Sequence, residues 1–302
     1  MTTGQEILVL GGSGVDTIVR VDELTVPAGD SVAVPAIRDY VAHTGTGVAL
    51  GFHVLGRSTA FLDLIGEDEQ GELVRARYRA AGLDFAWLPA PAGTPRSVNL
   101  VDRQGRRFSF YDGRHPEDVR LPADFCRPRL ARAAHVHVSG LGICRDLLGE
   151  IQRSPATLST DVHAWDGHAA WAENYAYGSD LVFMSAATVG DRAPDVLRRI
   201  LTRGRARVAV ATDGANGCWT ATRERPEAVH RPAVAPPGPV VDSNGAGDAF
   251  VTAFVDVWLR GGDVEAAVLA GSASGAFACT RAGTHERLIT RAELDEAVAA
   301  LR

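Results

Sequence analysis

The sequence predicts an α/β protein with a largely parallel sheet that helices cover on both faces. Short, continuously apolar segments such as residues 6–10 and 208–211 are typical of buried parallel strands. They alternate with stretches of helical periodicity through most of the chain, the pattern of strand–helix–strand units. Residues 17–43 and 94–111 are different, because proline and glycine break them into short alternating pieces that predict further strands. We expect a single domain over residues 1–302.

The composition excludes several classes of protein. Of 302 residues, 46% are hydrophobic and 23% charged, which is ordinary for a soluble globular protein. The net charge of −6 argues against nucleic acid as the main partner, and no apolar run is long enough to span a membrane. The N-terminus lacks the basic start of a secretory signal and the four cysteines are far apart, so we expect a cytoplasmic protein with reduced thiols.

The chain contains no lysine, since all 31 residues of the lysine and arginine class are arginine. This excludes a Walker-type phosphate loop with its lysine, and any Schiff-base mechanism. Positive charge beside a phosphate must therefore come from arginine, from backbone N–H groups or from a metal ion.

A glycine-rich turn, residues 11–14, follows the first apolar segment. A dinucleotide-binding turn needs Gly-x-Gly-x-x-Gly at the start of a helix. Here Thr17 stands in place of the third glycine and strand-like residues follow, so a nicotinamide cofactor is disfavoured. Asp16 lies just after the turn, where an aspartate commonly serves the turn itself.

The most informative stretch is residues 240–250. Val240 and Val241 predict the end of a strand, and small residues at 245–247 then lead into a helix whose first turn contains Asp248. Backbone N–H groups at a helix start have no partner inside the helix and lie at its positive end, so they can bind a phosphate. Asp248 beside that anion is suited to take a proton from a hydroxyl group. The alternative is an aspartate that only favours the helix start.

Residues 242–248 resemble the Asp-Thr-x-Gly-Ala-Gly-Asp signature of the ribokinase-like sugar kinases, the PfkB family, with Ser243 in place of threonine. The resemblance implies that Asp248 is the catalytic base. It implies an anion hole formed by Gly245, Ala246 and Gly247. It also implies ATP and Mg²⁺ as cofactors, and a monovalent cation such as K⁺ near Asp242.

Other segments carry the same resemblance. Residues 14–22 are similar to the family's N-terminal Gly-x-Asp pattern, which implies that Asp16 hydrogen-bonds the hydroxyls of a sugar. The family also implies that residues 17–43 and 94–111 form a small β-sheet lid, which closes over the sugar and excludes water. Exposed strand edges on such a lid favour lid-to-lid pairing in a homodimer.

Residues 43–56 resemble the family's second signature, Gly-Gly-x-x-x-Asn-x-Ala ending in Leu-Gly, in shape and spacing but not in identity. The paired glycines of the signature fall at Ala42 and His43, and its asparagine falls at Gly47. We therefore expect Gly45 or Gly47 to take over the substrate-binding role. This departure affects the identity of the sugar more than the fold.

Two turns are candidates for the nucleotide site. The first turn follows a clear strand and contains Thr212-x-Gly214-x-x-Gly217, which resembles the family's Thr-x-Gly-x-x-Gly. In such a turn the threonine hydroxyl can bind phosphate, and the two glycines let the phosphate come close to the backbone. A plain hairpin turn is the alternative. The turn around Gly283 resembles the one that lines the family's nucleotide site. Asp161 and His163, at another strand end, belong either to a turn or to a metal site, and they are candidate pocket residues.

Further candidates lie at other strand ends. Ser139 follows the strand of His135 and His137 at a position where sheet enzymes place ligands, and it is a candidate for substrate binding; the two histidines are either packing residues or metal ligands. Ser185 and Thr188 stand where many family members have Asn-x-x-Glu, which is linked to magnesium. The Phe-x-Ser ending is closer to the ketohexokinase branch, so water and the nucleotide are expected to hold Mg²⁺.

The sequence thus predicts an ATP-dependent kinase that transfers the γ-phosphate to a primary hydroxyl of a ribose- or fructose-like sugar. Two alternatives stay open. Asn244 within the signature is seen in some adenosine kinases, which suggests a nucleoside acceptor. The altered second signature and the missing Asn-x-x-Glu would also suit a sugar sensor without catalysis, although a sensor does not need Asp248.

Overall fold

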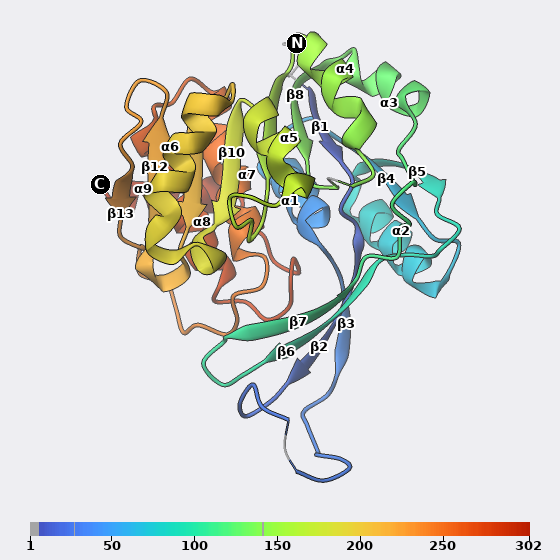
Figure 1. Cartoon of the computed structure of the whole chain (residues 1–302). Coiled ribbons are helices and arrows are strands. Elements are labelled where there is room, and N and C mark those ends of the chain that lie inside the picture. Colours follow the sequence, from blue (N-terminus) through green and yellow to red (C-terminus); the bar gives the residue numbers. More distant parts are fainter. Residues whose placement is uncertain (1–5, 27, 141) are drawn as a thin grey trace.

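The computed structural model describes residues 6–26, 28–140 and 142–302. Within them the chain forms a large sheet flanked by helices and a small sheet that projects away from it (Figure 1). The large sheet has the order β13-β12-β11-β10-β9-β8-β1-β4-β5. Its strands are β1 Glu6–Leu10, β4 Thr59–Ile65, β5 Asp84–Pro89, β8 Ala133–Val138, β9 Thr157–Asp161, β10 Leu181–Ser185, β11 Val208–Thr212, β12 Cys218–Thr222 and β13 Val229–Arg231. Pairing is parallel from β5 through β11 and antiparallel at β12 and β13, which confirms the predicted fold class.

Helices cover both faces of the large sheet (Figure 1). They are α1 Thr44–Val54, α2 Glu69–Ala81, α3 Ala123–Leu130, α4 Leu148–Arg153, α5 Ala170–Gly178, α6 Ala193–Arg203, α7 Ala246–Leu259, α8 Val264–Ala278 and α9 Arg291–Ala300. Short 3-10 turns are η1 Arg145–Leu147, η2 Ala186–Thr188, η3 Gly190–Arg192 and η4 Gly214–Asn216. Among the residues described, the helices are too short or too polar to cross a membrane.

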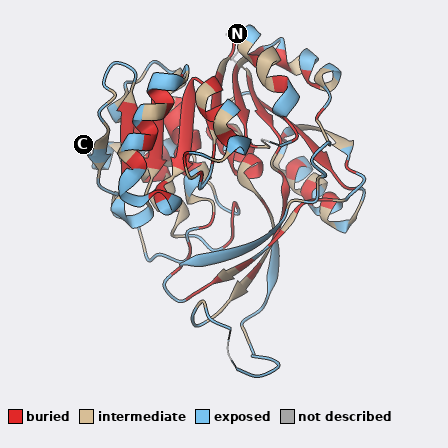
Figure 2. Ribbon diagram, viewed as in Figure 1, coloured by how far each residue is buried: buried red, intermediate tan, exposed pale blue. Residues whose placement is uncertain are grey.

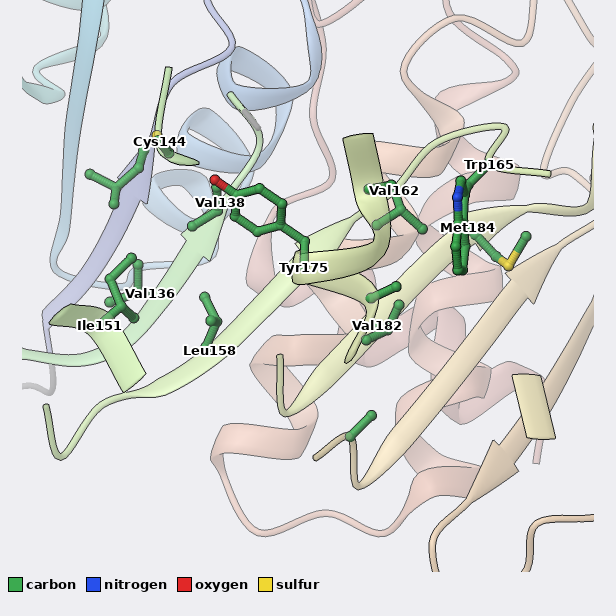
Figure 3. Close-up of a cluster of buried hydrophobic side chains, with 14 of the residues drawn as sticks. Val136, Val138, Cys144, Ile151, Leu158, Val162, Trp165, Tyr175, Val182 and Met184 are labelled. Carbon is green, nitrogen blue, oxygen red and sulfur yellow. The ribbon is translucent and has the colours of Figure 1, made fainter. Parts of the chain in front are cut away.

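Strand β1 shows why both faces need a cover. Its side chains alternate between two hydrophobic cores, as successive residues of a strand must. Ile7 and Val9 enter the core that contains Phe254 of α7. Leu8 and Leu10 enter the core on the other face, part of which is drawn in Figure 3. A strand that is buried on both faces has the continuous apolar run seen in the sequence.

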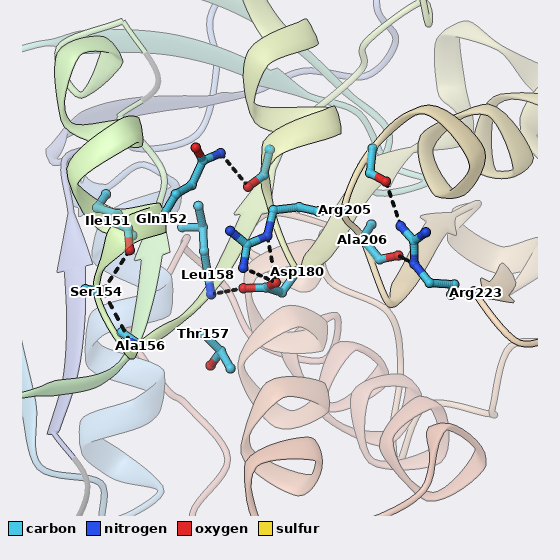
Figure 4. A network of polar contacts seen from close by, with 12 residues as sticks. Ile151, Gln152, Ser154, Ala156, Thr157, Leu158, Asp180, Arg205, Ala206 and Arg223 are labelled. Carbon is cyan, nitrogen blue, oxygen red and sulfur yellow. Dashed lines mark hydrogen bonds and ion pairs between the residues drawn. The ribbon is translucent and has the colours of Figure 1, made fainter.

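Asp180 links neighbouring parallel strands at their amino ends (Figure 4). Its carboxylate accepts a hydrogen bond of 2.8 Å from the backbone N–H of Leu158 in β9. It also pairs at 2.8 Å with Arg205, which lies just before β11. These contacts help to set the strand order at the end of the sheet away from the carboxyl ends of β1, β8 and β9.

The small sheet has the order β3-β2-β6-β7 and draws on two distant segments. Its strands are β2 Gly14–Arg20, β3 Arg38–Ala42, β6 Arg96–Val101 and β7 Arg107–Asp112. Register places Asp16 opposite Ser97 and Asn99 opposite Ser109, so these side chains share the face toward the large sheet. Val98 and Phe110 are also paired and lie on the outer face, which is exposed along β7 (Figure 2).

The sequence prediction that Val240 and Val241 end a strand is wrong. Both side chains are exposed, and the backbone here belongs to no sheet. The N–H of Val241 donates instead to the carbonyl of Cys279 at the end of α8, at 2.8 Å. Prolines at 236, 237 and 239 provide no N–H for a strand ladder, so β-branched residues alone do not make a strand here.

Gly45 occupies a position where the backbone of α1 touches the turn after β1. A Cβ atom at this residue would overlap the carbonyl oxygen of Gly11. The N–H of the next residue, Thr46, donates to the carbonyl of Gly12 at 3.3 Å. The glycine therefore lets the helix start lie directly on the turn that leads into β2.

We predict that Gly45→Ala lowers the free energy of unfolding by about 1–3 kcal/mol, since the added methyl group forces the backbone apart. Gly149→Ala is the matched control, because the nearest atom to a Cβ there is Arg153 Nη1 at 3.4 Å. That change is expected to be neutral or stabilising in helix α4. Chemical denaturation of the two variants gives the comparison; equal stability would contradict the packing role of Gly45.

Candidate active site

Asp248 lies in the first turn of α7, at the end of the large sheet that faces the small sheet. The helix is preceded by Gly245, whose φ of 71° lies in the left-handed region that favours glycine. A Cβ atom at Gly245 would overlap the carbonyl oxygen of Thr284. The N–H of Ala246 makes only a long contact, 3.4 Å, with the carbonyl of Ser243. The N–H groups of Gly247 and Asp248 have no acceptor within the helix, so this helix start can bind an anion.

The surroundings of Asp248 favour its protonated form. Burial raises the pKa of this carboxyl well above its ordinary value, and the negative charges of Asp161 and Asp16 raise it further. The positive charge of Arg107 acts in the opposite direction. A raised pKa makes a carboxylate a stronger base, which suits a group that must accept a proton from a hydroxyl.

Asp16 lies in β2 and is surrounded by hydrogen-bond donors. Its buried carboxylate accepts from Nδ2 of Asn99 at 2.9 Å and from Oγ1 of Thr284 at 3.2 Å, and it lies 3.3 Å from Nε2 of His43. Burial alone would raise the pKa of Asp16, but the hydrogen bond and charge of His43 and the hydroxyl of Thr284 hold it below the ordinary value. Asp16 is therefore ionised and fixed in place.

Several buried polar atoms around these two carboxylates have no hydrogen-bond partner among the described residues. They are Oδ1 of Asn99, Oγ of Ser139, Nδ2 of Asn244 and both ring nitrogens of His285. Leaving a buried polar atom unpaired costs about 1–3 kcal/mol, so such a group needs an explanation. A ligand with many hydroxyl groups would satisfy donors and acceptors alike.

The small sheet touches the loop before α7 at three points. Arg20 pairs with the buried Asp242 at 2.8 Å. Arg107 donates to Oδ1 of Asn244 at 3.2 Å, and Oγ of Ser243 donates to the carbonyl of Gly105 at 3.2 Å. The small sheet thus lies over the candidate phosphate site, with two arginines brought to its edge.

Of the residues predicted to bind the sugar, only some lie beside Asp248. Gly47 faces Asp248 directly, since a Cβ atom there would lie 2.7 Å from Cβ of Asp248. Gly45 faces the turn after β1 instead and has a packing role. Ser139 lies at the end of β8, beside Gly12 of the same turn.

The predicted nucleotide residues form two groups. Thr212, Gly214 and Gly217 lie in the hairpin between β11 and the antiparallel β12, so the turn considered as an alternative is present. A Cβ atom at Gly217 would overlap the carbonyl oxygen of Arg231, so close packing in the hairpin is enough to explain a glycine at this position. Gly283 lies near the loop before α7, with its N–H 3.4 Å from Oδ2 of Asp242. Contact of these residues with a nucleotide stays a prediction.

Sequence reasoning missed His43, Asn99 and His285 as site residues. His43 has a φ of 73° at the start of α1, at a position where the family signature has glycine, and this conformation is strained for other residues. Asn99 shares one face of β6 with Ser97 and Val101, so an inward-facing amide was a usable signal. His285 follows the turn of Gly283, but no local pattern connects it with Asp248.

Asp63 of β4 supports the turn that leads to Asp16. Its buried carboxylate accepts the N–H of Ser13 at 2.6 Å and that of Leu64 at 2.7 Å. Burial raises the pKa of Asp63 to about 6, although these hydrogen bonds oppose the shift. The turn is thus held by a carboxylate that is costly to ionise.

We predict that Asp63 makes the protein less stable as the pH rises from 4 to 6. The folded state holds the proton of the Asp63 carboxyl more tightly than the unfolded chain does. The protonated carboxyl therefore contributes up to about 3 kcal/mol to the free energy of unfolding below pH 4, and this contribution is lost as the pH rises above 6. Asp63→Asn removes the titration. The unfolding free energy of the wild type minus that of the variant should fall over this range in urea titrations; a constant difference would contradict the assignment.

A family model described as pfkB family carbohydrate kinase matches residues 5–162 and 178–291. The chain is 47% identical over 295 residues to an acarbose 7(IV)-phosphotransferase of Actinoplanes sp., which covers 97% of this chain and 98% of the relative. It is 26% identical to a nucleoside kinase of Methanothermobacter thermautotrophicus over 95% of this chain and 94% of that protein.

Solved structures agree with these matches. A microbiome-derived acarbose kinase superposes with a TM-score of 0.91 and 42% identity, covering 98% of this chain and 100% of that one. Arabidopsis thaliana ribokinase, complexed with ribose and ATP, superposes with a TM-score of 0.80 over 98% of this chain and 99% of its own. Its 16% identity supports a shared fold and nothing finer.

Proposed function

The chain belongs to the PfkB family of carbohydrate kinases, and within that family we propose that its acceptor is acarbose or an oligosaccharide of similar chemistry. The protein is an ATP-dependent sugar kinase, a phosphotransferase with a hydroxyl acceptor, as the sequence predicts. The ribose- or fructose-like acceptor expected from the sequence is not what the most similar relatives act on. The observation that carries the proposal is 47% identity over nearly the whole chain to an acarbose phosphotransferase.

The mouth of the site suits an acceptor longer than one sugar ring. Tyr111 of β7 is 69% exposed on the inward face of the small sheet, and its ring lies 5.5 Å from that of His43. The exposed aromatic ring of Tyr111, close to the His43 that contacts Asp16, can stack on a second sugar ring of the acceptor.

We assign the chemical roles as follows. Asp16 holds and orients the acceptor, and Asp248 takes the proton of the reacting hydroxyl. The hydroxyl oxygen forms a bond to the γ-phosphorus while the bond from that phosphorus to the β-phosphate oxygen breaks, and ADP leaves. The N–H groups of Gly245, Ala246 and Gly247 stabilise the charge on the transferred group. Arg107, at the edge of the small sheet, adds positive charge in a chain without lysine.

The site fits a magnesium ion better than it fits a monovalent cation. Mg²⁺ bound with ATP would neutralise phosphate charge, and the carboxylate of Asp161, close enough to act on Asp248, would hold it directly or through water. A monovalent cation at Asp242 is harder to fit. Oδ1 of this carboxylate accepts the N–H of Asn244 at 3.0 Å, and Oδ2 already pairs with Arg20. A K⁺ ion there stays a prediction, and it would compete with this arginine.

We also propose a homodimer that forms through the small sheet. Its outer face carries Val98, Phe108 and Phe110, and the two phenylalanines are more than half exposed. Strand β7 is an edge strand, so its unpaired backbone groups need a cover. We place the enzyme in the cytoplasm, where its ATP is available.

We predict that Asp248→Asn lowers kcat/KM at least about a hundredfold, because the amide cannot accept the proton. The readout is ADP release with acarbose, ribose, fructose and adenosine as acceptors.

Asp263→Asn is the matched control, since Asp263 also starts a helix, where asparagine caps equally well. Turnover of acarbose should exceed that of the other three. Preferred turnover of adenosine or fructose would refute the acceptor, and an active Asp248→Asn variant would refute the base.

We predict that Phe108→Ser combined with Phe110→Ser converts the dimer to a monomer, because the outer face loses its apolar contacts. Sedimentation velocity measures the mass in solution. Trp171→Ser removes an exposed aromatic side chain from α5 and should leave the mass unchanged. A monomeric wild type would overturn this part of the proposal.

A further inference from the structure

His285 lies between the two carboxylates of the site. Its imidazole is buried, with only 2% of the residue exposed, and Nε2 lies 3.4 Å from Oδ2 of Asp248. The preceding residue, Thr284, donates to Asp16. One short loop after α8 therefore contacts both the orienting carboxylate and the candidate base.

Two glycines make room for this ring. A Cβ atom at Gly47 would overlap Cε1 of His285, and a Cβ atom at Gly245 would lie 2.8 Å from Nδ1. Gly47 is the position where the family signature has asparagine, so here the imidazole fills space that a side chain on α1 would occupy. Both neighbouring segments thus have the small residues that His285 requires.

The ring is neutral at neutral pH. Burial lowers the pKa of His285 to about 4, although the charge of Asp16 and the carbonyl of His43 raise it, and the positive charges of His43 and Arg77 lower it. Arg77 of α2 donates to the backbone carbonyl of His285 at 3.2 Å, which holds the loop in place. A neutral imidazole carries one N–H and one acceptor nitrogen, so its tautomer decides what it offers to Asp248.

We propose that His285 is a positioning residue that donates its Nε2–H to Oδ2 of Asp248 and leaves Oδ1 free to accept the proton of the substrate. The distance of 3.4 Å is slightly long, and such contacts commonly shorten when substrate binds. The donated hydrogen bond stabilises the charged carboxylate, which limits the upward shift caused by burial and by Asp161. The inference rests on the proposed role of Asp248 as the base.

The test compares His285→Leu, which keeps most of the volume but removes the donor, with His285→Gln, which retains an N–H. In His285→Leu, kcat is expected to fall about tenfold to a hundredfold, since a hydrogen bond to a charged group is lost. The acidic limb of the kcat–pH profile should move up by about one unit, because the carboxylate loses a donor. His285→Gln should restore most of both, and KM for ATP should not change.

An unshifted acidic limb in a folded His285→Leu variant with lowered kcat would overturn the proposal, since a purely structural role predicts that result. If His285→Leu does not fold, ¹⁵N NMR of histidine-labelled wild type decides, with the His285→Gln spectrum identifying the signal. A proton on Nε2 supports the proposal, and a proton on Nδ1 alone overturns it. Asp248→Asn separates the two claims, because activity in that variant would refute the base itself and not only its positioning.

Discussion

Two carboxylates with opposite environments, one buried and one partly buried, are the constraint on which the site depends. Asp16 receives hydrogen bonds from Asn99 and Thr284 and lies beside His43, so its pKa is lowered. Asp248 has His285 beside it, and burial together with nearby negative charge raises its pKa. When neighbouring groups have pKa values pushed in opposite directions, they suit different chemical tasks. This contrast supports the roles we propose, in which the ionised Asp16 orients the acceptor and Asp248 accepts a proton.

The fold brings these groups together because three separate parts of the chain meet at one end of the parallel sheet. Strand β2 carries Asp16 into the small sheet, α7 presents Asp248, and the loop after α8 lies between them. Arg20 and Arg107 extend from the small sheet to the loop before α7. A site assembled in this way depends on the small sheet staying in place over it, and these contacts keep it there.

Much of this was predictable from sequence, because the informative patterns were local. Continuous apolar runs identified the parallel strands, and the glycine-rich signature identified Asp248. Val240 and Val241 were wrongly assigned to a strand, since β-propensity says nothing about whether a partner strand exists. His285 was missed for a related reason: its contacts with Gly47 and Asp248 join distant segments. The departures of His43 and Gly47 from the family pattern were visible, but their meaning needed the structure.

The most direct test of this account is a crystal structure with acarbose and a non-hydrolysable ATP analogue. The account predicts that the reacting hydroxyl oxygen lies within about 3.2 Å of the Asp248 carboxylate. It also predicts that a second hydroxyl group contacts Asp16, and that Oδ1 of Asn99 and Nδ1 of His285 gain partners. An acceptor bound outside the space between Asp16 and Asp248, with those atoms still unpaired, would contradict it.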